Sequence, residues 1–145
     1  MSEDFVSFEL AKKLKEKGFR KPCVATYDKD GMLGYNYFQP QSIRAVSFDD
    51  CLCLGDDCLT APTISQVLKW LREKSIFVEP CILTDFDIDA DGKVINEYTY
   101  WSFSVTNIET GDMIYFEYEH VDDKRFDSYE QASIAGIEYC LDNLI

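Results

Sequence analysis

Three aspartates at alternate positions precede a glycine and are the first residues whose spacing could do chemistry. Asp87, Asp89 and Asp91 match the first half of a calcium-binding loop, D-x-D-x-D-G, which could curl around one hard cation. The match ends there, because Tyr98 occupies the twelfth position, where a bidentate glutamate belongs, and Glu97 lies one residue early. The flanking residues predict strands rather than helices. We therefore interpret the segment as a hairpin turn, with calcium binding as the alternative.

A second candidate metal site lies in an acidic segment with the spacing C-x-C-x₄-C. Cys51, Cys53 and Cys58 could bind zinc, but structural zinc sites usually take four ligands, commonly from paired C-x₂₋₄-C units. A fourth ligand would have to be an aspartate or His120. The alternatives are an acidic loop with incidental thiols, or a strand on which Cys51 and Cys53 share a face. We predict no metal and no other cofactor.

Catalysis by an activated nucleophile needs a positioned base, and His120 is the single histidine of the chain. The strand register predicted below places it opposite Trp101 at the end of a buried face, which favours a packed, hydrogen-bonded side chain. The 27 carboxylates single out no catalytic pair, and no G-x-G-x-x-G, Walker A or H-E-x-x-H pattern occurs. The sequence therefore favours a non-enzymatic protein, with a hydrolase using His120 or a carboxylate pair as the alternative.

The charge of the chain is strongly asymmetric. The net charge is −13, and it divides into +2 for residues 1–45 and −15 for residues 46–145. Such a field repels nucleic-acid backbones and anionic membranes and favours basic protein partners. The N-terminal part carries a basic cluster, Lys12, Lys13, Lys15, Lys17, Arg20 and Lys21. This cluster is most simply the solvated face of a helix, but it could also contact the acidic part of another copy, so self-association is possible.

The length of 145 residues predicts a single domain, residues 1–145. No stretch approaches the roughly 20 apolar residues of a membrane span, and the acidic N-terminus is not followed by the apolar region of a signal peptide. Cytoplasmic localisation is therefore expected. In a reducing compartment the six cysteines should be thiols, and three of them lie in apolar patterns typical of core residues: Cys23, Cys81 and Cys140.

Hydrophobic periodicity and turn signals predict eight elements in the order α-β-β-α-β-β-β-α. The first helix is expected over Asp4–Lys17, and two strands over Cys23–Tyr27 and Gly34–Phe38. Residues 39–60 are expected to be irregular, with a possible short strand near Ile43–Phe48. The second helix follows Pro62 with a Thr63–Gln66 capping box, and the third begins at the N-cap Ser128.

The three central strands form a predicted meander with two-residue turns at Asp91-Gly92 and Thr110-Gly111. Ile88 then faces Ile95, Ile82 faces Trp101, Val105 faces Phe116 and Phe103 faces Tyr118. Strand alternation places one set of apolar residues on a single face, namely Ile76, Val78, Ile82, Phe86, Ile88, Ile95, Trp101, Phe103, Val105, Ile114, Phe116 and Tyr118. The opposite face, with Ser102, Ser104, Thr106, Glu117 and Glu119, is expected to be wet. The predicted fold is a two-layer α+β domain in which helices pack on one face of an antiparallel sheet.

Three segments carry a resemblance to known sequences. They are a helix ending in K-G-F (residues 7–19), an A-P-T-x-S-x-x-x-K-W-L-R-E helix (residues 61–73) and a closing Y-E-x-A helix that begins at Tyr129. Together they resemble a set of small uncharacterised proteins from gut anaerobic bacteria and their phages and prophages. The resemblance implies a mobile-element setting and no particular activity.

From these observations we expect a small cytoplasmic protein–protein interaction module, possibly of phage or prophage origin, whose partner has a basic surface. Direct nucleic-acid binding and membrane binding are not expected. The alternative within binding proteins is an acidic nucleic-acid mimic that inhibits a DNA-binding enzyme, which requires carboxylates at phosphate-like spacing on one exposed face. The alternative of another class is the hydrolase named above.

Overall fold

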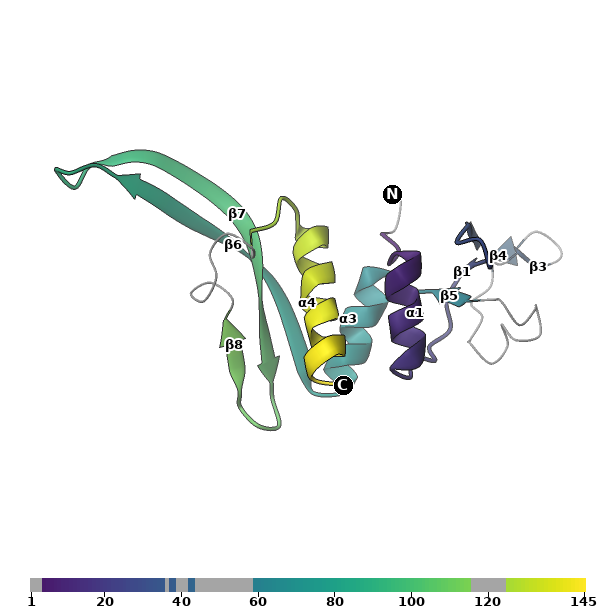
Figure 1. Ribbon diagram of the computed structural model, residues 1–145. Helices are drawn as coiled ribbons and strands as arrows, with labels where there is room; N and C mark the ends of the chain where they lie inside the picture. Colours follow the sequence, from purple (N-terminus) through teal and green to yellow (C-terminus); the bar gives the residue numbers. More distant parts are fainter. Residues whose placement is uncertain (1–3, 36, 39–41, 44–58, 116–124) are drawn as a thin grey trace. The chain divides into compact units, whose positions relative to one another are not determined.

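The computed structural model describes residues 4–35, 37–38, 42–43, 59–115 and 125–145 (Figure 1). The three helices and the strands that these residues form alternate in an α+β arrangement in which every paired strand is antiparallel. The elements are α1 (Phe8–Glu16), β1 (Ala25–Tyr27), β2 (Leu33–Tyr35), β3 (Tyr37–Phe38), β4 (Ser42–Ile43), β5 (Leu59–Ala61), α3 (Ile64–Glu73), β6 (Ile76–Ile88), β7 (Val94–Asn107), β8 (Met113–Tyr115) and α4 (Tyr129–Asn143).

The predicted α+β class is confirmed, and the observed order is close to the predicted one. Among the residues that the structure describes, the strands form three sheets rather than the one sheet that we expected, with the orders β2-β1-β5, β3-β4 and β6-β7-β8. The residues group into two compact units, Met1–Trp70 with Leu141–Ile145, and Leu71–Cys140. The single domain expected from the length stays a prediction. None of the helices in the described ranges is long and apolar enough to span a membrane.

In the first unit, α1 begins later than predicted. The Ser7 hydroxyl accepts a hydrogen bond from the Leu10 amide (3.2 Å) and caps the helix, so Asp4 is not its start. The residues before Ser7 are extended because they pair with the chain ahead of α3. The Val6 amide donates to the Pro62 carbonyl (3.0 Å), and the Ile64 amide donates to the Asp4 carbonyl (3.0 Å). Backbone pairing over a distance in sequence thus overrides the helical propensity of the first turn.

The apolar residues of α1 contribute to the core of the first unit, as the periodicity predicts. Leu10, Ala11 and Leu14 are buried. The sheet β2-β1-β5 includes a strand in the segment that we expected to be irregular, since β5 pairs with β1 in the register Ala25↔Ala61. The predicted capping box at the start of α3 is confirmed. The Gln66 amide donates to the Thr63 hydroxyl (3.2 Å), and the Thr63 amide donates to Gln66 Oε1 (2.9 Å).

In the second unit, β6 and β7 form a long antiparallel hairpin whose register is the predicted one over most of its length. Ile82 pairs with Trp101, as expected. The prediction that Ile88 faces Ile95 is wrong, because Ile88 pairs with Val94 and a bulge lies between Asp87 and Ile88 in the ladder. The extra residue of a bulge compensates for a turn that differs from the assumed two-residue type. The rest of the hairpin is therefore unshifted.

The hairpin between β7 and β8 has a longer loop than predicted, closed by a hydrogen bond from the Asn107 amide to the Asp112 carbonyl (2.9 Å). Val105 consequently pairs with Ile114 rather than with Phe116. Phe116 and Tyr118, the predicted partner of Phe103, lie outside the described residues. The shift is by two residues, so the side chains that it moves keep their predicted faces.

The predicted place of His120 opposite Trp101 is also wrong. The Trp101 amide donates to the Phe126 carbonyl (2.9 Å), and the Phe126 amide donates back to the Trp101 carbonyl (2.8 Å), so Phe126 is the cross-strand partner. His120 itself lies outside the described residues, as do Cys51, Cys53, Cys58 and most of the predicted strand Ile43–Phe48.

The face predicted to be buried is buried in its inner half alone. Val78, Phe103 and Val105 are at most 9% exposed, and α4 packs against them where Gly136 lies close to Val78 and Phe103. The outer half extends beyond α4 (Figure 1). A helix of 15 residues such as α4 spans about 22 Å, whereas a strand of 13 residues such as β6 spans about 43 Å. One helix is therefore too short to cover the whole hairpin.

The opposite face of β7 departs from its prediction as well. Ser102 and Ser104 were expected to be wet but are buried, while Thr106 is half-buried. β7 is the central strand of its sheet, and short serine side chains with strands on both sides are easily shielded from water. Glu117 and Glu119 lie outside the described residues.

Candidate functional site: the outer arm of the β6–β7 hairpin

The aspartates of the predicted calcium motif lie at the tip of the hairpin, where Asp89 organises the turn. Its Oδ1 accepts hydrogen bonds from the amides of Asp91 and Lys93 (both 2.9 Å). The Asp89 amide donates to the Lys93 carbonyl (2.9 Å), and Gly92 has a φ of +82°, a conformation that favours glycine. The Asp89 carboxylate is thus used by the backbone of the turn.

A second D-x-D-G segment, between β1 and β2, forms the same turn. Asp28 Oδ1 accepts from the amides of Asp30 (2.8 Å) and Met32 (3.0 Å), and the Asp28 amide donates to the Met32 carbonyl (3.1 Å). Gly31 has a φ of +79°. This segment has no aspartate two residues earlier and so lacks the calcium-like triplet. The recurrence supports the interpretation of D-x-D-G as a backbone turn signal in this chain.

The first aspartate of the motif, Asp87, is held away from the turn. Asp87 accepts hydrogen bonds from the Tyr98 hydroxyl (3.0 Å) and from Asn96 Nδ2 (3.3 Å). Within the described ranges, no three His, Cys, Asp or Glu side chains are grouped so that they could hold a metal ion. The two aspartates that should converge on calcium therefore serve different partners.

We predict that Asp89→Ala lowers the free energy of unfolding by about 1 kcal/mol, because two backbone amides lose their acceptor. Asp28→Ala, the matched control in the other turn, should cost a similar amount. Millimolar calcium should leave the melting temperature of the wild-type protein and of both variants unchanged in a thermal melt. A large calcium-induced rise that Asp89→Ala abolishes would show that the loop binds calcium.

We define the outer arm as residues 82–100, the part of the hairpin beyond its buried base. One of its two faces, which we call the polar face, is organised by Arg125. The guanidinium Nη2 lies 2.6 Å from Asp85 Oδ2, and its Cζ lies 4.6 Å from the ring centre of Tyr100 and 5.3 Å from that of Tyr98. Stacking and ion pairing together fasten the segment ahead of α4 to the arm.

The electrostatics of this cluster keep Arg125 charged. Burial acts to lower the pKa of Arg125, but the Tyr98 hydroxyl and the Asp85 carboxylate outweigh that effect and raise the pKa above its ordinary value. Arg125 Nε is buried and has no hydrogen-bond partner among the described groups. Asp85 and Asp87 are thus both engaged by neighbours, and the polar face presents a bonded network rather than a row of free carboxylates.

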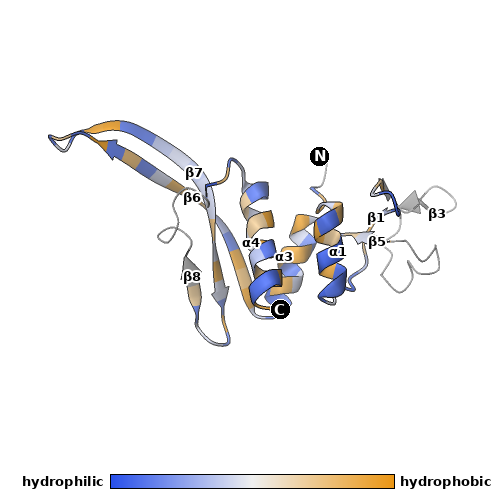
Figure 2. Ribbon diagram, in the orientation of Figure 1, coloured by the Kyte–Doolittle hydropathy of each residue, from blue (hydrophilic) through white to orange (hydrophobic). Residues whose placement is uncertain are grey.

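The other face of the outer arm, which we call the apolar face, is open to solvent. Its large side chains are 47% to 62% exposed, and they are Ile82, Phe86, Ile88, Val94 and Ile95. Figure 2 shows apolar and polar residues alternating along the outer part of β6. They share this face with Thr84, Thr99 and Glu97, and exposed large apolar side chains grouped on one face of a hairpin are of the kind that marks an interaction site. The strand pattern of the sequence placed Ile82, Phe86, Ile88 and Ile95 on this face but wrongly predicted that they are buried, and it did not include Val94, which the bulge pairs with Ile88.

The charge around the apolar face is negative. The outer arm contains five acidic residues and one basic residue, which is a formal charge of −4. Among the residues of the apolar face and its edges, Glu97 is exposed and has no ion-pair partner in the described part of the chain. The arm therefore combines apolar contact area with an acidic border.

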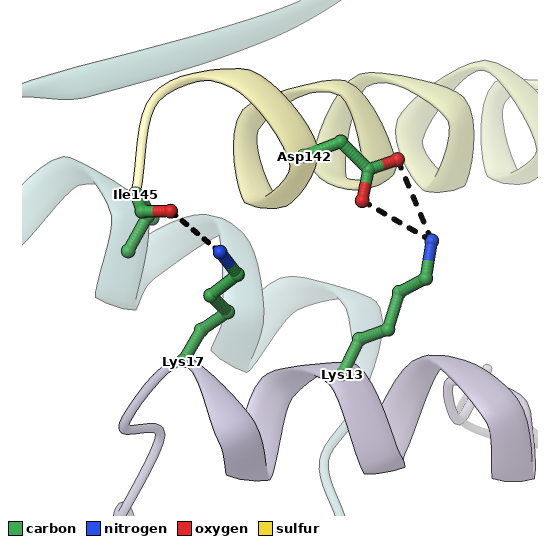
Figure 3. Close-up of polar contacts among 4 residues, drawn as sticks. All are labelled: Lys13, Lys17, Asp142 and Ile145. Carbon is green, nitrogen blue, oxygen red and sulfur yellow. Dashed lines mark hydrogen bonds and ion pairs between the residues drawn. The ribbon is translucent and has the colours of Figure 1, made fainter.

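The basic cluster of α1 is largely occupied by contacts within the first unit. Lys12 Nζ lies 3.1 Å from Glu9 Oε1. Lys13 Nζ lies 3.3 Å from Asp142 Oδ1, and Lys17 Nζ donates to the Ile145 carbonyl (2.7 Å) (Figure 3). Lys15, Arg20 and Lys21 also have interaction partners. Self-association through this cluster stays a prediction, and it would have to compete with these contacts.

Two of the cysteines are poor candidates for a nucleophile. Burial raises the pKa of Cys23 to about 11, with a smaller opposing effect from Thr60, and burial raises the pKa of Cys140 to about 12. A nucleophilic cysteine needs a lowered pKa, because the thiolate is the reactive form. Both residues are fully buried, as the sequence predicts for core positions, whereas Cys81 is partly exposed.

The raised thiol pKa values predict a loss of stability at alkaline pH. The unfolded thiol ionises near 9.0 and the folded thiol does not, so the stabilisation is fully present below pH 9 and falls as the pH rises toward 11 or 12. At pH 10 each thiol should lower the free energy of unfolding by about 1 kcal/mol. Urea denaturation at pH 8 and pH 10 tests this, with Cys140→Ala as the control. The variant should lose correspondingly less stability between the two pH values than the wild type, and an equal loss would contradict the prediction.

No protein family model, curated protein or solved structure matches the chain. The resemblance to proteins of gut bacteria and their phages therefore stays a prediction. The candidate site consists of an apolar face, an acidic border and a polar face bound by Arg125, all on one hairpin.

Proposed function

We propose that the protein is a small, non-enzymatic, cytoplasmic interaction module of phage or prophage origin, and that the outer arm is its docking element. The partner is a protein that offers an apolar surface bordered by Lys and Arg. The single observation that carries the proposal is the apolar face, whose five large side chains are about half exposed or more.

The energetics support docking on this face. Burying the exposed part of each large apolar side chain contributes about 1 kcal/mol, so five of them contribute roughly 5 kcal/mol before the costs of association. That is enough to anchor an interface when hydrogen bonds and charges add to it. An isolated two-stranded hairpin is also marginally stable in water, so a partner that covers the arm stabilises it.

The charge supports a basic partner. The outer arm carries a formal charge of −4 and the whole chain −13. Complementary charge accelerates association and excludes acidic partners, and its contribution falls as salt screens exposed charges.

The test is affinity capture from lysate of the source cells with three proteins: the wild type, the double variant Phe86→Ser with Ile88→Ser, and the control variant Ile108→Ser. Ile108 is 58% exposed but lies in the β7–β8 loop, away from the apolar face. A partner retained by the wild type and the control, lost by the double variant and weakened at high salt is the expected result. A partner retained equally by all three proteins would overturn the proposal.

No observation in the described residues favours the alternatives. A nucleic-acid mimic needs exposed carboxylates in a row, whereas Asp85 is paired with Arg125 and Asp87 is hydrogen-bonded to Tyr98. A hydrolase built on a thiol would need an activated cysteine, and the pKa values of Cys23 and Cys140 are raised.

A further inference from the structure

The outer edge of β7 carries a line of backbone hydrogen bonds that stops partway along the strand. The Asn107 amide donates to Asp112, and Val105 pairs with Ile114 of β8. Further along, both backbone groups of Trp101 bond to Phe126. In an antiparallel ladder alternate residues direct their N–H and C=O groups to the same edge. The next residues that face this edge are Thr99 and Glu97.

Thr99 and Glu97 have no backbone partner on that edge among the residues that the structure describes. Both residues are exposed. The chain that pairs with Trp101 leaves the edge directly after Phe126, because the Asp127 amide donates to Gln131 Oε1 (3.1 Å) at the start of α4. Within the described part of the chain, the edge of β7 beyond Trp101 therefore presents backbone donors and acceptors that have no partner.

The opposite edge of the hairpin, on β6, is protected by two features. Ile82 lies across from Trp101, whose backbone groups bond to Phe126 and therefore point away from β6. Ile82 and the other even-numbered residues of β6 consequently direct their own backbone groups outward, away from β7. Pro80 is one of them and has no N–H to offer, and the outward N–H of Phe86 is taken by Asp85 Oδ1 (2.9 Å). Proline and side-chain capping are devices that keep an edge strand from pairing. The β7 edge lacks both at Thr99 and Glu97.

We propose that the β7 edge at Thr99 and Glu97 binds an extended segment of the partner by strand addition, as a third strand of the outer arm. This inference rests on the proposed function and specifies the mode of binding. The added strand bonds to the free backbone groups, and its alternate side chains extend the apolar face beside Ile95. The strand carries Lys or Arg opposite Glu97, because opposite charges favour cross-strand pairs. A second copy's arm is the wrong occupant, since it carries the same charge of −4.

The experiment uses a fluorophore-labelled synthetic peptide, the Lys–Val peptide, in which Val and Lys alternate along one strand face and Thr occupies the other (Val-Thr-Lys-Thr-Val-Thr-Lys). Its binding to the full chain is measured by anisotropy. Thr99→Pro removes the outward N–H from the β7 edge. Thr84→Pro is the matched control, because it removes an outward N–H from the β6 edge of the same hairpin. Circular dichroism checks that both variants keep the wild-type fold.

The expected result is that the wild type and Thr84→Pro bind the peptide with similar affinity, while Thr99→Pro binds it about tenfold more weakly or worse. A matched peptide in which Glu replaces each Lys should not bind. Equal binding of the Lys–Val peptide by both variants, or no binding by the wild type, overturns strand addition and leaves docking on the apolar face to be judged by the Phe86→Ser and Ile88→Ser capture. Analytical ultracentrifugation tests whether the protein instead forms a dimer through the arm. A dimer that is lost in Thr99→Pro would assign the β7 edge to a second copy of the chain, and it would overturn the proposal that this edge binds a basic segment of a partner.

Discussion

Replacing Phe103 with alanine should lower the free energy of unfolding by about 3–5 kcal/mol, whereas Phe86→Ala should lower it by less than about 1 kcal/mol. The two residues are of one type and lie on one face of one hairpin. Phe103 is 2% exposed and Phe86 is 47% exposed. Removing the Phe103 ring leaves a cavity between the hairpin and its covering residues, while the Phe86 ring is already half in water.

Chemical denaturation monitored by circular dichroism measures both values. The pair keeps residue type and sheet face constant, although Phe103 lies on the central strand β7 and Phe86 on the edge strand β6. The difference between the two variants therefore reports mainly how the face is covered. A large loss for Phe86→Ala in the isolated protein would mean that another layer covers the outer arm, and the proposed docking face would then be wrong. A small loss for Phe103→Ala would contradict the buried base of the hairpin.

Replacing Gly136 with alanine should lower stability by about 1–3 kcal/mol, although alanine is the better helix former by about 1 kcal/mol. A Cβ at this position would lie 2.4 Å from Val78 Cγ1 and 3.2 Å from Phe103 Cδ2, closer than carbon atoms pack. Valine has a stiff χ1, and its strand holds the backbone in place, so Val78 cannot move aside cheaply. α4 and the hairpin must therefore separate slightly or distort.

The second variant of this prediction is Val78→Ala, which removes the atom that the new Cβ would meet. The double variant Gly136→Ala with Val78→Ala should lose less stability than the two single variants lose in total. We expect the difference to be about 1 kcal/mol or more, and a double-mutant cycle measures it. Strict additivity would contradict the close contact. A stabilised Gly136→Ala single variant would show that helix propensity outweighs packing here.

The two predictions concern the base of the hairpin, and the base makes the outer arm possible. α4 packs against the inner apolar face at Val78 and Phe103. Arg125, in the segment ahead of α4, forms an ion pair with Asp85 and stacks on Tyr100 of the polar face. The arm beyond is held at one end and carries its apolar residues in water. Such an arrangement costs solubility and stability, and a protein partner that covers the apolar face offsets both costs.

Local signals in the sequence determined much of the fold. The Thr63–Gln66 capping box, the apolar stripe of α1 and the register Ile82↔Trp101 were predicted from residue types and spacing and are confirmed. The D-x-D-x-D-G segment was predicted as a hairpin turn and forms one, although its length was misjudged. These features depend on interactions between residues close in sequence, or on a period-two pattern that tolerates shifts of two residues, so a single sequence is sufficient to read them.

Tertiary structure alone decided which parts of each sheet face are covered by another element. The alternation that places Phe103 and Phe86 on one face is the same for both residues, and only the reach of α4 separates a buried ring from an exposed one. The pairing of Trp101 with Phe126, which displaced the predicted place of His120, and the pairing of β5 with β1 join residues far apart in the chain. Strand periodicity reports which side chains share a face, but burial depends on the size and position of the element packed against that face, and these are properties of the folded chain.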